Sequence, residues 1–185
     1  MVSVNEKVGD FVLDSVVGGR RERIGLSHYR GKYLLIFFYP VNFTFASAHH
    51  ISSVDDVSQE LQELNSEVIG ISGEHVQCLA SFQKSFLGQT EVRLVSDPFK
   101  QIQDYFGVSA KGMTHGGSVL AVIDPKGRLL SMETCHSQIG FDMKEVLRKL
   151  KESLKCPECG GKIIEEVIRG EKTRQYCEDC QLLRI

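Results

Sequence analysis

The sequence predicts an α/β fold, in which a mixed sheet carries helices on both faces, followed by a small cysteine-rich module. The apolar run at residues 33–39 is typical of a fully buried strand. Up to about residue 150, such runs alternate with segments of helical periodicity, a pattern that favours a layered α/β domain. Four of the six cysteines form two Cys-x-x-Cys pairs in the last thirty residues, which sets that part apart.

The first half of the chain alternates strand and helix signals. The Gly18-Gly19 pair separates two short runs and predicts an N-terminal hairpin. The buried strand at 33–39 ends at Pro40, because proline cannot donate to a sheet ladder. Apolar residues then recur at helical spacing, which predicts a helix over 51–64, and residues 67–72 form the next short buried strand.

The second half repeats this alternation and closes with a hairpin and a helix. Apolar residues at steps of three and four predict a helix over 78–87, whereas short apolar runs predict strands. Asp97-Pro98 stops one strand and residues 124–127 form a turn between two others. The expected elements are strands at 92–95, 119–123 and 128–133, a short helix ending at Gly107, and an amphipathic helix over 141–154.

Composition and charge exclude several classes of function. Hydrophobic residues make up 42% of the chain, which suffices for an ordinary core, and the net charge of -2 favours neither a polyanion nor an anionic membrane surface. No apolar run approaches the roughly 20 residues of a membrane span. The N-terminal residues lack the basic start and apolar stretch of a secretory signal, so a cytoplasmic location is expected.

The two cysteine pairs at the C-terminus predict a metal site. Cys156 and Cys159 are separated by seventeen residues from Cys177 and Cys180, and the residues between the pairs predict a hairpin. Four thiolates satisfy a tetrahedral Zn²⁺ ion and leave no open position for catalysis. We therefore expect a structural zinc ribbon with four cysteine ligands at 155–185, after a main domain at 1–154. Rubredoxin-like iron and redox dithiols are the alternatives.

The charge of this module bears on its partner. From Lys151 to the end, the chain carries seven Lys or Arg and seven Asp or Glu residues. No basic patch stands out, which disfavours phosphate-driven binding of nucleic acid. The expected role is docking of a protein partner or support of an oligomer.

Several motifs occur in the order and spacing of one family. They are Leu26–Tyr33, Phe37–Pro40, Phe43–Phe45, Ser96–Pro98, Tyr105–Val108 and Ile123–Gly127. On these motifs, the chain from about Val8 to Leu154 resembles a peroxiredoxin. The resemblance implies a thioredoxin-like three-layer sandwich with a mixed central sheet, and reduction of hydroperoxides through a cysteine sulfenic acid. It also implies a possible homodimer and, if the protein is active, a thioredoxin-like donor.

The same resemblance assigns site residues and shows where this chain departs from the family. Pro40 and Thr44 match the active-site loop, but Ser47 occupies the position of the peroxidatic cysteine. His50 replaces a supporting acid, and Ser118 stands where an arginine is expected. A hydroxyl does not follow the thiol oxidation pathway, so we expect the peroxidase activity to be lost or impaired and a binding or regulatory role to remain.

Three hypotheses therefore stay open for this loop. The first is the degenerate site just described. The second is an active peroxidase seen as a Cys-to-Ser variant at position 47, which would not explain His50 and Ser118. The third is an unrelated chemistry of Ser47 with His50, similar to half of a hydrolase triad.

Other candidate residues lie nearby in the sequence. His49, His50, His75 and His115 are expected to be surface or loop residues with local hydrogen bonds. The alternatives are that some of them gather at one edge of the sheet, where imidazoles could bind a metal or transfer protons. Neighbouring helix residues point about 100° apart, so His49 and His50 are not expected to share one ligand. Cys78 and Cys135 are expected to be small buried hydrophobic residues rather than relocated nucleophiles.

Overall fold

The computed structural model divides the chain into two compact units, Met1–Met143 and Lys144–Ile185. The expected domain boundary after residue 154 falls outside the described residues and stays a prediction. None of the described helices is both long and apolar enough to cross a membrane. The structure describes residues 1–40, 42–88, 90–108, 118–135 and 141–153, and the three C-terminal strands 163–168, 172–177 and 183–184.

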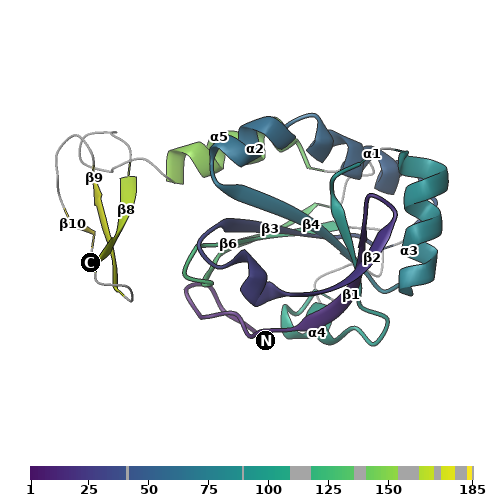
Figure 1. The fold of residues 1–185 in the computed structure, drawn as a ribbon, viewed down its shortest axis with the longest axis horizontal. Helices are drawn as coiled ribbons and strands as arrows, with labels where there is room; N and C mark the ends of the chain where they lie inside the picture. Colours follow the sequence, from purple (N-terminus) through teal and green to yellow (C-terminus); the bar gives the residue numbers. More distant parts are fainter. Residues whose placement is uncertain are drawn as a thin grey trace. The chain divides into compact units, whose positions relative to one another are not determined.

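The first unit is built on one seven-stranded mixed sheet (Figure 1). Its strand order is β2-β1-β5-β4-β3-β6-β7. Strands β3, β4 and β5 are parallel to one another, β1 and β6 are antiparallel to them, and the edge strands β2 and β7 pair antiparallel with β1 and β6. The predicted mixed α/β sheet is thus confirmed. The strands are β1 (Val12–Val17), β2 (Arg20–Gly25), β3 (Tyr33–Phe38), β4 (Ser66–Ser72), β5 (Arg93–Ser96), β6 (Ser118–Ile123) and β7 (Leu129–Cys135).

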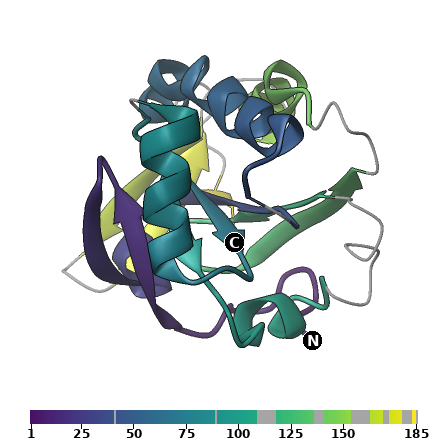
Figure 2. The same cartoon turned by 90° about the vertical axis from the view of Figure 1, so that its right-hand side faces the viewer.

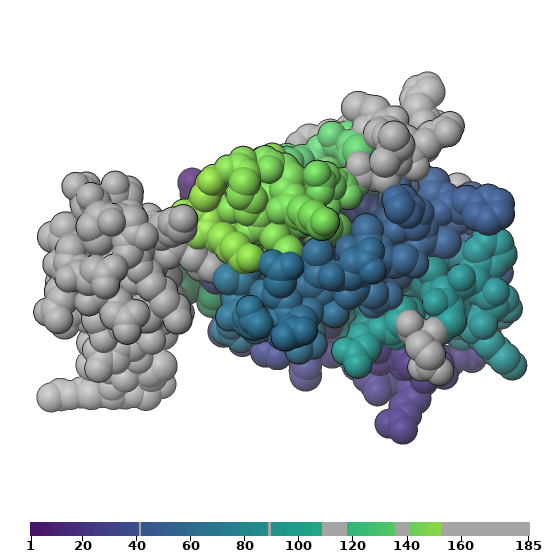
Figure 3. All heavy atoms as spheres, turned by 90° about the horizontal axis from the view of Figure 1, so that it is seen from above, coloured from purple at the N-terminus to yellow at the C-terminus, as the bar shows by residue number. Residues whose placement is uncertain are grey.

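Helices cover both faces of this sheet. Helices α1 and α2 lie on one face and α4 on the other, and Figure 2 shows α3 beside α1. Seen from above, side chains of α1 and α2 cover their face (Figure 3). The helices are α1 (Phe45–Asp55), α2 (Ser58–Glu63), α3 (Val76–Phe82) and α4 (Gln101–Tyr105), with a 3₁₀ turn η1 (Leu26–Tyr29) and a π-helical turn η2 (Gln83–Leu87).

The inner strand β3 supplies core residues to both faces of the sheet. Leu34, Ile36 and Phe38 belong to a cluster that also contains Ile102 and Phe106 of the α4 region. Leu35, Phe37 and Tyr39 alternate with them and are equally buried, since successive strand residues point to opposite faces. This explains why the run has no polar alternation, as expected for a strand buried on both faces.

Two helix boundaries differ from the sequence expectation. The single helix predicted over 51–64 is two helices, and the first begins at Phe45, six residues early. Thr44 explains this start, because its side-chain oxygen accepts a hydrogen bond from the Ser47 N–H and so caps the helix. Ser47 therefore lies within the first turn of α1 rather than ahead of it.

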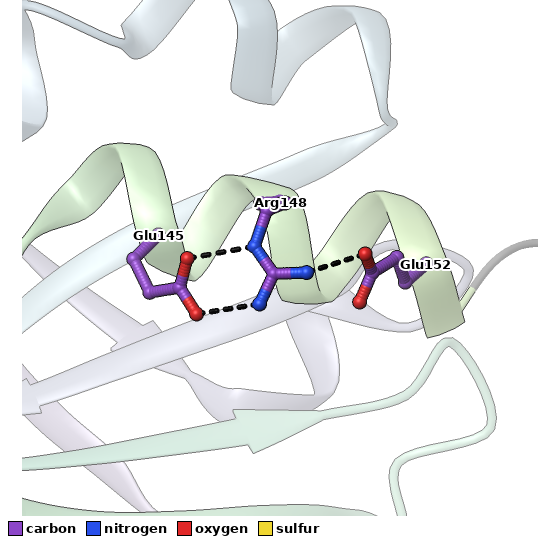
Figure 4. Close-up of polar contacts among 3 residues, drawn as sticks. All are labelled: Glu145, Arg148 and Glu152. Carbon is purple, nitrogen blue, oxygen red and sulfur yellow. Dashed lines mark hydrogen bonds and ion pairs between the residues drawn. The ribbon is translucent and has the colours of Figure 1, made fainter.

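The second unit contains a helix and a three-stranded antiparallel sheet. Helix α5 begins at Met143 of the first unit and ends at Ser153, and strands β8 (Ile163–Ile168) and β9 (Lys172–Cys177) form the predicted hairpin, with β10 (Leu183–Arg184) beside β9. On α5, Arg148 donates to both oxygens of Glu145 at 2.7 Å and also pairs with Glu152 (Figure 4). These i,i+3 and i,i+4 pairs support an exposed helix face.

Candidate functional site

The loop between β3 and α1 brings two hydroxyl groups, those of Thr44 and Ser47, into a hydrogen bond with each other. The Thr44 hydroxyl accepts from the Ser47 N–H at 3.1 Å and donates to Ser47 Oγ at 3.0 Å. Ser47 is only 3% exposed. The sequence predicted that Pro40, Thr44 and Ser47 share this loop, and the geometry makes Thr44 both the helix cap and the direct neighbour of Ser47.

The position of Ser47 would suit an anionic nucleophile. The first turn of a helix presents unpaired N–H groups and the positive end of the helix dipole, which favour negative charge. A thiol there would be activated as a thiolate. Ser47 instead carries a hydroxyl, which is far less acidic, so the favourable location alone does not generate a nucleophile.

The two adjacent histidines point to different environments, as predicted. His49 is exposed, whereas His50 is 6% exposed and packs edge-on against Phe37 with 5.5 Å between ring centroids. His50 also lines a small, mainly apolar cavity with Leu120 and Phe141. His75 is exposed just before α3, and His115 lies outside the described residues. The histidines therefore do not share one environment.

Ser118 lies near the start of the loop between β3 and α1. It is the first residue of β6, next to the Phe38–Val119 pair, and is thus level with Tyr39 at the end of β3. Ser118 is 1% exposed. The register thus brings Ser118, at the position where the resemblance led us to expect an arginine, level with the start of the loop that carries Ser47.

The described arginines of the first unit lie elsewhere. Three are on the edge strand β2, and the other three lie at the far ends of β3, β5 and β6. No guanidinium from this part of the structure therefore supplies positive charge at the carboxyl end of β3. These arginines are Arg20, Arg21, Arg23, Arg30, Arg93 and Arg128.

A buried polar group follows β3 directly. Tyr39 is fully buried, and burial is the main cause that raises the pKa of its phenol above the ordinary value, so the hydroxyl stays neutral. Its ring packs over Gly70, where a Cβ would lie 3.1 Å from Tyr39 Cε1. Asn42 Nδ2 donates to Ser72 Oγ at 3.4 Å, which links the loop to the end of β4. These contacts hold the loop but offer no charge to it.

Aromatic rings border the same loop. Phe43 has a left-handed backbone with φ of 57°, which is uncommon for a bulky residue. Its ring contacts Phe82 and Phe86 at centroid distances of 5.3 and 5.7 Å. Phe86 lies in the π-helical turn. Such turns are rare in proteins, and those that occur are often found at functional sites. Sequence reasoning missed both features, since spacing alone predicted an ordinary helix here.

The thiols fall into two groups. Cys78 on α3 and Cys135 at the end of β7 are half-buried, not fully buried as expected from the sequence. Cys177 ends β9, whereas Cys156, Cys159 and Cys180 lie outside the described residues. Within the residues whose placement is described, no group of three or more His, Cys, Asp or Glu side chains could hold a metal ion. The zinc site predicted at Cys156, Cys159, Cys177 and Cys180 is therefore not tested by the structure and stays a prediction.

Comparison with known proteins agrees with this architecture. Residues 4–132 match the model of the AhpC/TSA family. The chain is 33% identical to mouse "Peroxiredoxin-2" over 159 residues, which cover 80% of this chain and 79% of that protein. It is 32% identical to bovine "Thioredoxin-dependent peroxide reductase, mitochondrial" over 142 residues, covering 74% of this chain and 55% of the other.

A solved structure gives the same result. The fold is similar to that of Enterococcus faecalis AhpC, with a TM-score of 0.74 and 29% identity, over 83% of this chain and 93% of that one. The family match spans the strands and the loop that position Ser47. The chain therefore belongs to the peroxiredoxin (AhpC/TSA) family.

Proposed function

We propose that this chain is a peroxiredoxin-family protein that no longer reduces hydroperoxides at its active loop and acts as a binding or regulatory module. The observation that carries the proposal is Ser47, buried in the first turn of α1 and bonded to Thr44. Peroxide reduction requires a sulfur atom that accepts oxygen to give a sulfenic acid. A serine hydroxyl has no corresponding reaction.

The surroundings of Ser47 support the same conclusion. Ser118 supplies a neutral hydroxyl at the base of the loop, and His50 is buried against Phe37. A positive charge fixed beside the nucleophile would favour a thiolate. Because several positions of the site differ together, a single Cys-to-Ser exchange at position 47 does not account for the arrangement.

Peroxide consumption with a thiol donor tests this proposal. We expect both the unaltered chain and the Ser47→Cys variant to stay at the background rate of the donor. Rapid turnover by Ser47→Cys alone would favour the active-peroxidase hypothesis. Turnover by the unaltered chain that vanishes in Cys78→Ser would indicate a relocated thiol, and Ser47-dependent ester hydrolysis would favour the Ser47–His50 chemistry.

The module at 155–185 is proposed to bind one structural Zn²⁺ ion through Cys156, Cys159, Cys177 and Cys180. The hairpin register supports this, because Cys177 pairs with Ile163 at the open end of β8 and β9. Cys159 precedes Ile163 by four residues, a reach of at most about 14 Å. The short separations along the chain are therefore compatible with a site shared by both cysteine pairs at that end of the hairpin. Bound zinc would supply folding energy that so small a module lacks.

Metal analysis of the purified chain tests the ribbon. We expect one zinc per chain and a colourless protein, with chelation abolishing the strand signal of β8 and β9. Cys156→Ser should lose the metal, whereas Cys78→Ser, a matched control outside the module, should retain it. Coloured iron-containing protein, or full retention of the hairpin without metal, would contradict the assignment.

The remaining expectations are also proposals. A thioredoxin-like donor applies only if the loop proves active, and it is suggested by the name of the mitochondrial relative. A homodimer and a protein partner of the ribbon are proposed on the grounds given by the sequence. The relatives include a mitochondrial protein, so the cytoplasmic location stays a prediction.

A further inference from the structure

Strand β8 forms one edge of the three-stranded sheet in the second unit (Figure 1). Among the described strands it pairs only with β9, in an antiparallel register that runs from Ile163 opposite Cys177 to Ile168 opposite Lys172. Every second residue of such an edge strand directs its N–H and C=O groups away from the paired neighbour. These groups form a template for one further strand, and six residues are an ordinary strand length.

The sequence of β8 combines strand-forming residues with a negative centre. Four of its six residues are Ile or Val, whose branched side chains favour strands. Glu165 and Glu166 lie between them, one on each face of the sheet, because successive strand residues alternate. An incoming strand would therefore meet two negative charges at its centre and apolar residues on both sides of them.

The neighbouring strand shows which residues β8 already accepts opposite its acids. Arg174 of β9 stands opposite Glu166, and the uncharged Gln175 stands opposite Glu165. Opposite charges at directly opposed positions stabilise a strand pair, and like charges destabilise it. Both acidic residues of the three strands lie on β8, whereas the basic residues lie on β9 and β10; these are Lys172, Arg174 and Arg184. The described sheet thus ends in a negative edge.

The same charges disfavour pairing of β8 with the β8 strand of a second copy. The antiparallel alignment that pairs all six residues would set Glu165 of each chain opposite Glu166 of the other. The parallel in-register alignment would set each glutamate opposite its own counterpart, and both arrangements are repulsive. A shift by two residues avoids the repulsion but leaves only four paired residues. A foreign strand with basic residues at its centre pairs over the full length without this cost.

We propose that the β8 edge binds an extended basic segment of another protein, which adds to the sheet with two adjacent Lys or Arg residues opposite Glu165 and Glu166. Main-chain hydrogen bonds supply affinity in this mode of recognition, and the glutamates select the charge of the segment. The inference rests on the proposed docking role of the C-terminal module and specifies its surface and partner. Metal-loaded protein without peptide binding would refute the docking alone, whereas peptide binding by a zinc-free chain would refute the zinc site alone.

Fluorescence anisotropy of three labelled peptides with the full chain tests the docking. The basic peptide is Thr-Val-Lys-Arg-Val-Thr, the acidic peptide has Glu at both central positions, and the third is the basic peptide with proline in place of both valines. Proline has no N–H to donate, and the two replaced positions alternate, so one of them must pair with β8 in either alignment. We expect saturable binding of the basic peptide and at least tenfold weaker binding of the other two.

Charge reversal on the protein provides the matching test. Glu165→Lys combined with Glu166→Lys should weaken the basic peptide at least tenfold and make the acidic peptide the tighter ligand, since two attractive cross-strand pairs become repulsive. Glu60→Lys combined with Glu63→Lys is the matched control, because both residues are exposed on α2 of the first unit. The control should bind all three peptides as the unaltered chain does.

The peptide series decides the proposal on the unaltered chain even where the doubly reversed variant fails to fold. Equal binding of the basic and acidic peptides would show that the glutamates select nothing. Undiminished binding of the proline peptide would show that no strand is added. Either result, no saturable binding, or self-association of the unaltered chain that the basic peptide displaces would overturn the proposal.

Discussion

Adding Ser118→Arg to the Ser47→Cys variant is expected to raise peroxide consumption about 100-fold over Ser47→Cys alone. Ser118 lies beside Tyr39 at the base of the loop, so an arginine there would place its charge near residue 47. A guanidinium would stabilise the thiolate introduced at position 47 and the charge that develops during oxygen transfer. The increase in peroxide consumption measures how much of the missing peroxidase activity depends on the residue at position 118.

The controls distinguish the effect of the added arginine charge from the effect of the added thiol. Ser118→Arg in the chain that keeps Ser47 should show no turnover, because the added charge has no thiolate to act on. Position 118 is 1% exposed, so thermal unfolding should be followed in every variant to show that the arginine is accommodated. A folded double variant that stays at background would contradict the role given to Ser118.

Replacing Gly127 with alanine is expected to destabilise the first unit by about 3 kcal/mol. Gly127 has φ of 80°, and a Cβ there would lie 0.7 Å from Arg30 Nη1. Arg30 would have to move, and it would lose its hydrogen bonds to the carbonyls of Lys126 and Val8 at 3.0 and 3.2 Å. The cost of backbone strain at position 127 and the cost of the lost Arg30 hydrogen bonds therefore add up.

Gly19 offers a matched control for the strain alone. Its φ is 76° and nothing lies within 4 Å of a Cβ built there. Gly19→Ala should therefore cost only about 1–2 kcal/mol. Urea unfolding of both variants, and of Gly127→Ala in an Arg30→Ala background, isolates the Arg30 contribution. Equal costs at the two glycines would show that Arg30 adds nothing.

The sheet of the first unit could be predicted from the sequence because its signals are local. The run at 33–39 is apolar at every position, and only a strand buried on both faces explains that pattern. Gly18 and Gly19 both adopt positive φ, so the residue types that mark the hairpin turn are the ones its geometry requires. These elements needed no information from distant residues.

The helix boundaries could be predicted less well, for different physical reasons. The start of α1 could have been predicted from the sequence, because Thr44 is a good helix-capping residue. Its hydroxyl accepts a hydrogen bond from the N–H of Ser47, three residues later. The break between α1 and α2 could not, because Val57 precedes α2 without a side-chain cap. The π-helical turn was not predicted either, because the apolar residues over 78–87 have the spacing of an ordinary helix.

The candidate site shows the same division. Pro40, Thr44 and Ser47 share one short segment, so their association could be predicted from the sequence alone. The neighbourhood of Ser118 and Tyr39 depends on the register between β3 and β6, across about 80 residues of chain. Ser118 was assigned to the arginine position from the family resemblance, and the register shows only that it lies level with Tyr39. The contacts of Phe43 and Phe45 with Phe86 were not predicted, because they join segments about 40 residues apart in the sequence.

Turnover of hydrogen peroxide by the unaltered polypeptide, with a thiol donor in excess, tests the central claim most directly. The reaction should be repeated with Cys78→Ser and Cys135→Ser combined, so that both half-buried thiols are removed. We predict consumption at the donor's own background rate in both proteins. Sustained turnover that survives removal of both thiols and disappears only when Ser47 is replaced by alanine would contradict it.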